Sequence, residues 1–193
     1  MNDTKNRIIA TAYELFKIKG YDQVSINDIC RACKITKTTF YYHLKSKEDI
    51  IIGFYDPATE SLVNEMAEIL SANNYWEQLM KLFETLIHKS EEIGPDLDSQ
   101  TMIINLKENR GSYDFREDLT KIAVILIEKA QQAGEIRNQS SPEQLYRASA
   151  YAYMGYEFTW CVKKGNFNRM KYIRNAMENI YDVAPELRVG YTP

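Results

Sequence analysis

Long stretches of this sequence contain neither glycine nor proline, the two residues that most often interrupt secondary structure. Only eight glycines and five prolines occur in 193 residues, and most of them stand between segments whose apolar residues recur at helical spacing. This pattern favours an all-α fold over strands and turns. We expect about nine helices, which cover residues 4–19, 25–33, 36–44, 46–70, 74–92, 97–108, 112–133, 141–164 and 168–183.

Two short helices are expected directly after the first one. Ser25 and Asp28 have the capping-box spacing, a serine followed three residues later by an acid. Thr36 is a typical N-cap residue for the third helix. Only about three residues separate the second helix from the third, which predicts a helix-turn-helix. We therefore expect a helix-turn-helix domain at residues 1–46 and a larger helical domain at residues 47–193.

A longer helix is expected after this head, beginning at Ser46, where Ser46 and Asp49 repeat the capping pattern. Pro57 lies inside the segment. Because proline removes a backbone donor and crowds the preceding turn, we expect a kink or a break there.

The charges are distributed unevenly along the chain. The net charge is −3, which argues against a protein that coats nucleic acid. Residues 1–50 nevertheless contain nine basic and six acidic side chains, whereas the remaining residues contain fifteen and twenty-one. A basic head on an acidic body fits a protein that contacts phosphate groups at one end only.

Several other classes of protein are disfavoured. No apolar run approaches the roughly 18 residues of a membrane-spanning helix, and the N-terminus leads into an amphipathic segment instead of a secretion signal. Three cysteines are too few for a disulfide framework, so we expect a cytoplasmic protein. Cys30 and Cys33 form a C-x-x-C pair that lacks the further ligands of a zinc site. Because no catalytic motif is present, we predict no metal, no cofactor and no enzymatic activity.

The N-terminal residues resemble the TetR/AcrR family of transcriptional regulators over about residues 5–55. The resemblance is carried by Ile8-x-x-x-Ala12-x-x-Leu15-Phe16, Gly20-Tyr21, Ser25-Ile26-x-Asp28-Ile29, Ile35-Thr36-Lys37-x-Thr39-Phe40-Tyr41-Tyr42-His43-Leu44 and Lys45-Ser46-Lys47-Glu48-Asp49. Two positions depart from the family pattern. Lys34 stands where the turn normally has a glycine, so this lysine must adopt an unfavourable backbone angle or shift the turn. His43 stands where the family has a tyrosine.

The resemblance implies that the third helix lies in the major groove of DNA and reads bases with its early residues. Lys37 and Tyr42 are then the candidates for base contacts, and Thr38 could touch a thymine methyl group. The candidates for phosphate contacts are Thr36, Tyr41, His43 and Lys47. The alternative is that these side chains only form the solvated face of a small helical subdomain.

A single head buries too little surface for tight specific binding, so a homodimer that reads a pseudo-palindromic operator in double-stranded DNA is implied. Small residues that let helices approach closely form one stripe of the 141–164 helix, and apolar residues form another on the 168–183 helix. As in the family, these two helices would pair across a two-fold axis. The predicted interface residues are Ala148, Ala152, Gly155, Thr159, Ile173, Met177 and Ile180. Alternatively, both stripes pack only within their own subunit.

Apolar and aromatic side chains of the body could line a cavity for a small-molecule effector, whose identity the sequence does not give. The candidates are Trp76, Met80, Phe83, Met102, Leu106, Tyr153, Glu157 and Trp160. Plain core packing is the alternative for each apolar residue among them, and Glu157 needs a partner if it is buried. These features predict a ligand-responsive homodimeric repressor. The competing interpretations are a co-regulator of the same fold that acts through a protein partner, and an enzyme in the body that uses Glu157.

Overall fold

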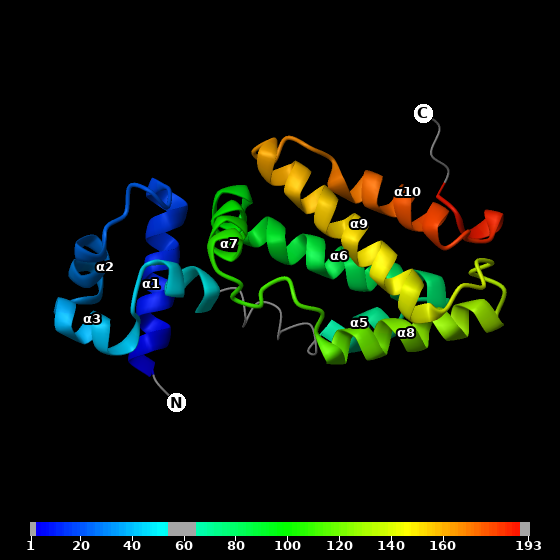
Figure 1. The fold of residues 1–193 in the computed structure, drawn as a ribbon, viewed down its shortest axis with the longest axis horizontal. Helices are drawn as coiled ribbons and strands as arrows, with labels where there is room; N and C mark the ends of the chain where they lie inside the picture. Colours follow the sequence, from blue (N-terminus) through cyan, green and yellow to red (C-terminus); the bar gives the residue numbers. More distant parts are fainter. Residues whose placement is uncertain (1–2, 54–64, 190–193) are drawn as a thin grey trace. The chain divides into compact units, whose positions relative to one another are not determined.

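The computed structural model describes residues 3–53 and 65–189 (Figure 1). Within these ranges the chain is helical, and the only extended pairing is an isolated bridge between Ile136 and Val183, so the all-α prediction is confirmed. The helices are α1 (Asp3–Lys19), α2 (Ile26–Cys33), α3 (Lys37–His43), α5 (Met66–Leu70), α6 (Tyr75–Ile93), α7 (Pro95–Lys107), α8 (Glu117–Gln132), α9 (Pro142–Val162), α10 (Arg169–Ile180) and the 3₁₀ turn η2 (Pro185–Leu187).

The long helix predicted from Ser46 is described only in part. Residues 48–53 are helical, and α5 covers its far end. The kink expected at Pro57 lies outside the described residues. The helix predicted to begin at residue 112 begins at Glu117 instead, because Gly111 (φ 79°) and the Asn105 side chain form a turn before it.

The chain divides into two compact units that are not continuous in sequence. Unit 1 consists of residues 1–61 and 93–113, and unit 2 consists of residues 62–92 and 114–193. Helix α7 therefore belongs to the same unit as the N-terminal helices. The functional division at residue 46 stays a prediction.

The core of unit 1 is shared between the three N-terminal helices and α7. Phe16 of α1, Ile29 of α2 and Phe40 of α3 are buried in one cluster, in which Leu97 and Ile104 of α7 also lie. These apolar residues share one face of each helix, as the helical period requires. Helix α3 thus rests on a core that residues from the middle of the chain complete.

The core of unit 2 lies between α6, α8, α9 and α10, and α9 packs along both α8 and α10 (Figure 1). Trp76 of α6, Ile127 of α8, Leu145 of α9 and Met177 of α10 are buried in it. None of the helices in residues 3–53 and 65–189 is both long and apolar enough to cross a lipid bilayer.

Candidate nucleic-acid interface

The turn between α2 and α3 is held by caps on both helices. The Ser25 hydroxyl accepts the Asp28 N–H at 3.2 Å, and the Asp28 carboxylate accepts the Ser25 N–H at 3.0 Å, so the predicted capping box is present. The Ser25 hydroxyl and the Ser25 N–H both donate to the Asp28 carboxylate, and these two hydrogen bonds lower the pKa of Asp28. At the other end of α2, Lys34 has φ 53° and ψ 45°. The lysine thus adopts the left-handed conformation, which is the first of the two outcomes expected at this position.

Helix α3 presents one face to the core and another to solvent. Its N-cap Thr36 accepts the Thr39 N–H at 3.1 Å, and Phe40 and Leu44 point inward. Thr36, Lys37, Thr38, Tyr41 and Tyr42 are exposed. Tyr42 is 83% exposed, although its ring is largely apolar.

His43, at the end of α3, is half-buried, and its ring meets the Tyr42 ring edge-on with centroids 4.9 Å apart. Six of the seven predicted DNA-contacting side chains, from Thr36 to His43, therefore occupy one short helical segment. Their contact with DNA stays a prediction.

Lys47 differs from this group. Its Nζ donates to the backbone oxygens of Tyr21 at 2.8 Å and Val24 at 3.1 Å, and lies 3.8 Å from the centre of the Tyr21 ring. The ammonium group is thus directed at its own chain, where it joins the start of the 48–53 helix to the turn after α1. These contacts give Lys47 a structural role, and its contact with phosphate stays a prediction.

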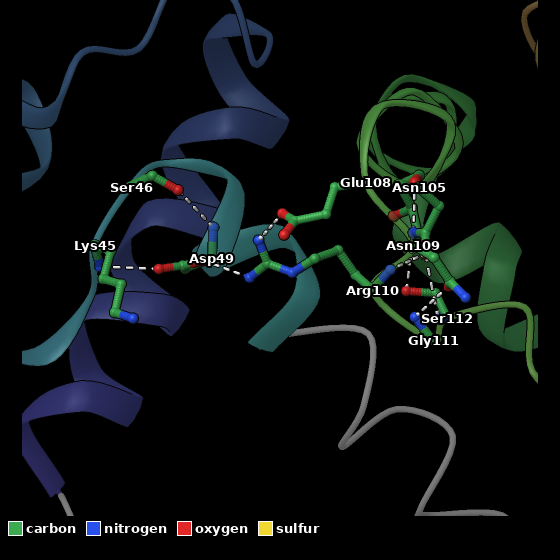
Figure 2. A network of polar contacts seen from close by, with 10 residues as sticks. Lys45, Ser46, Asp49, Asn105, Glu108, Asn109, Arg110, Gly111 and Ser112 are labelled. Atoms are coloured by element: carbon green, nitrogen blue, oxygen red, sulfur yellow. Dashed lines mark hydrogen bonds and ion pairs between the residues drawn. The ribbon is translucent and has the colours of Figure 1, made fainter.

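The turn that follows α3 is fixed by Asp49, which lies between Lys45 and Arg110 in Figure 2. The Asp49 carboxylate accepts the Lys45 N–H at 2.8 Å and Nη2 of Arg110 at 2.8 Å, while its own N–H donates to Ser46 Oγ at 3.3 Å. Burial alone would raise the pKa of Asp49, but the bonds from Arg110 and Lys45 outweigh it and hold the pKa below its usual value.

Arg110 is itself fixed at the end of α7. Its Nη1 pairs with Glu108 at 3.1 Å, and its N–H donates to the Asn105 side chain, which also accepts the Ser112 N–H (Figure 2). The Asn109 side chain accepts the Gly111 N–H at 2.9 Å. The Asp49–Arg110 pair could not be found from the sequence, because no local pattern connects residues 61 positions apart.

The predicted dimer residues fall into two groups. On α9, Ala148 and Gly155 are exposed, and Ala152 and Thr159 are half-buried. Three large apolar residues that the prediction did not include, Tyr151, Phe158 and Val162, are also exposed on this helix.

On α10 the outcome differs. Ile173 and Met177 are 0% exposed in the single chain, where they pack into the core of unit 2, so the prediction that they form the dimer interface is wrong. Ile180 is half-buried. The helical period placed these three residues on one face, but it could not tell which partner covers that face.

The predicted effector-binding residues do not gather in one described cavity. Trp76, Met80 and Phe83 are fully buried in unit 2 and Tyr153 packs against that core, as in the core-packing alternative. Leu106 of unit 1 is 85% exposed, and Met102 is half-buried. An effector site at these residues stays a prediction.

Glu157, the buried carboxylate, has the partner that the sequence required. Its Oε2 accepts hydrogen bonds from Arg169 and from Ser90 Oγ, the latter at 2.9 Å. The Arg169 guanidinium also donates to the Ile87 oxygen at 2.9 Å and stacks 3.7 Å from the centre of the Trp160 ring. Glu157 and Trp160 thus belong to one buried polar cluster that connects α6, α9 and the start of α10. No group of His, Cys, Asp and Glu within the described ranges could hold a metal ion.

Comparison with known proteins finds similarity to bacterial transcriptional regulators. Residues 8–53 match the family described as bacterial regulatory proteins, tetR family. The HTH-type transcriptional regulator YuxN of Bacillus subtilis is 30% identical over 128 residues, which cover 64% of this chain and 40% of that protein. The chain thus matches less than half the length of that relative.

Two solved structures have a similar fold over nearly all of this chain. Thermus thermophilus FadR, a TetR-family transcriptional repressor in complex with lauroyl-CoA, has a TM-score of 0.72 at 18% identity, with 98% of this chain and 97% of that chain covered. AibR in complex with isovaleryl coenzyme A and operator DNA has a TM-score of 0.57 at 19% identity, with 94% and 100% covered. At these identities the likeness concerns the fold alone.

Proposed function

Since the chain is a member of the TetR/AcrR family, we propose that it is a DNA-binding transcriptional regulator that acts as a ligand-responsive homodimeric repressor. The observation that carries this proposal is the exposed face of α3, where Lys37, Thr38 and Tyr42 point away from a fully buried Phe40. A helix of this kind enters the major groove and reads base edges with its early residues. Thr36, Tyr41 and His43 at its borders contact phosphates and set the register.

The proposed dimer uses α9. Tyr151, Phe158 and Val162 leave an apolar surface in water on a single chain, and Ala148 and Gly155 let a second helix approach closely. A two-fold pair presents two copies of α3, and it reads a pseudo-palindrome with half-sites about one helical turn apart.

The proposed effector is a small molecule that binds the body, and acyl-CoA thioesters are the first class to test because FadR and AibR are solved with such ligands. Effector and operator would favour different arrangements of the dimer. The coupling is reciprocal, so the effector weakens operator binding by the same factor as the operator weakens effector binding. Calorimetry with acyl-CoA thioesters of graded chain length, with and without DNA, measures that factor.

Selection of DNA duplexes from a random pool tests the function. We expect the full chain to enrich a pseudo-palindrome, and light scattering of the complex to give two chains per duplex. Enrichment of no sequence would contradict the proposal. Capture of a stable protein partner in that case would favour the co-regulator instead.

A further inference from the structure

A hollow of about 410 Å³ lies in unit 1 beside the C-terminal end of α3. Tyr42 and His43 of α3 line it. The charged residues of its lining are Lys5 of α1, Lys45, Asp49 and Arg110. The hollow is therefore continuous with the face of α3 that the proposed function assigns to DNA.

The lining of this hollow carries an excess of positive charge. Lys45 is exposed and Lys5 is half-buried, and within the described residues no ion pair joins either ammonium group to a carboxylate. Asp49 is the acidic group of the lining, and Arg110 neutralises it at 2.8 Å. Two ammonium groups thus stay available for a bound anion.

We propose that this hollow binds a phosphate group of the DNA backbone, next to the bases that α3 reads. Lys5 and Lys45 donate to the phosphate. Arg110 is a positioning residue, because it neutralises Asp49, which would otherwise repel the anion, and holds the turn that carries Lys45. This inference rests on the proposed function and extends the DNA-binding surface from α3 to α1 and to the end of α7.

The salt dependence of binding tests the two lysines. The probe is the duplex that wild-type protein selects, and fluorescence anisotropy gives its affinity between about 0.05 and 0.2 M salt. Each of Lys5→Gln and Lys45→Gln should reduce the slope of log K against log salt concentration by about 0.9, because one phosphate contact is lost. The ratio of affinities for selected and random duplexes should stay unchanged, since a phosphate contact carries no sequence information.

Lys17→Gln is the matched control. Lys17 lies on the same helix as Lys5 and is exposed, with its Nζ 4.8 Å from the centre of the Tyr13 ring, outside the hollow. This substitution removes the same charge from the chain and should leave the slope at the wild-type value.

Arg110→Gln tests the positioning role. It leaves Asp49 uncompensated, so both the slope and the affinity should fall. Adding Asp49→Asn removes the repelling charge and should restore the slope. A merely structural role would predict the opposite, because the double variant loses both sides of the ion pair.

The inference would be overturned if Lys5→Gln and Lys45→Gln both kept the wild-type slope of log K against log salt concentration on a duplex that the wild type prefers. The proposed function would still stand in that case. Enrichment of no duplex would overturn both. Titration with inorganic phosphate tests whether the hollow binds free phosphate instead of a DNA phosphate. Phosphate binding that Lys45→Gln abolishes, without any change in the DNA slope, would identify a site for free phosphate and also overturn the inference.

Discussion

Each compact unit of the molecule contains an arginine–carboxylate pair, and the two pairs lie in different surroundings. In unit 2, the side chains of Arg169 and Glu157 are 2% and 7% exposed, and Ser90 and the Ile87 oxygen are further hydrogen-bond partners of the pair. In unit 1, the side chains of Asp49 and Arg110 are 18% and 32% exposed, beside the proposed DNA-binding face.

This difference in exposure indicates whether each pair affects stability or the surface of the protein. Buried charges must be compensated, so the Glu157–Arg169 pair is coupled to the folding of unit 2. The Asp49–Arg110 pair is near solvent, where ion pairs add little to stability. Its effect is therefore on the arrangement and the charge of the surface around α3.

The largest expected effect follows from breaking the buried pair. Glu157→Ala leaves the Arg169 guanidinium buried without its partner, and the free energy of unfolding should fall by about 3–5 kcal/mol. Urea denaturation measures it, with Glu128→Ala on the exposed face of α8 as the control. Replacing both Glu157 and Arg169 by methionine should recover most of the loss. A single variant as stable as the wild type would show that the burial of the pair has no energetic consequence.

The next effect concerns the exposed apolar surface of unit 2. Phe158 is 58% exposed, and a central aromatic residue of an interface is worth about 2 kcal/mol or more. Phe158→Glu should therefore weaken dimerisation by about thirtyfold or more, with unfolding of the single chain nearly unchanged. Sedimentation equilibrium measures the association. An unchanged dimer would exclude this face of α9 from the interface.

A smaller effect is expected at two lysines in left-handed conformation, one in each unit. Lys34 ends α2 with φ 53°, and Lys164 follows α9 with φ 50°. Because only glycine adopts this conformation without a steric penalty, Lys34→Gly and Lys164→Gly should each raise the free energy of unfolding by up to about 1 kcal/mol. Thermal denaturation checks both, and a fall in stability for Lys34→Gly alone would show that its side chain makes a compensating contact.

The smallest effect is the pH dependence of the exposed pair. The folded state lowers the pKa of Asp49, so its contribution to stability is present above the unfolded pKa of about 3.9 and is lost as the pH falls through the folded value. The stability difference between wild type and Asp49→Asn should therefore shrink on acidification. A difference that grows between about pH 5 and pH 3 would contradict the lowered pKa.

Local sequence patterns predicted the elements of the head well. Ser25, Asp28 and Thr36 cap α2 and α3 because capping depends on residues three positions apart, and the strained Lys34 followed from the absence of a glycine. The sequence also predicted that Glu157 needs a partner if it is buried, although it did not identify Arg169 and Ser90 as the partners.

Contacts between distant segments could not be predicted in this way. Helical spacing placed Ile173 and Met177 on an apolar face, but their own subunit covers that face. The ammonium group of Lys47 donates hydrogen bonds to backbone oxygens of residues 23 and 26 positions away in the sequence. The Asp49–Arg110 pair likewise depends on how α7 joins the N-terminal helices, which no short motif encodes.

The most direct test of this account is the affinity of the Lys37→Ala/Tyr42→Ala double variant for the selected duplex and for a random duplex, measured by fluorescence anisotropy. If the exposed face of α3 reads bases, the preference for the selected duplex should fall by at least about thirtyfold, while the random duplex binds nearly as before. A double variant that keeps the wild-type preference would show that another surface reads the DNA.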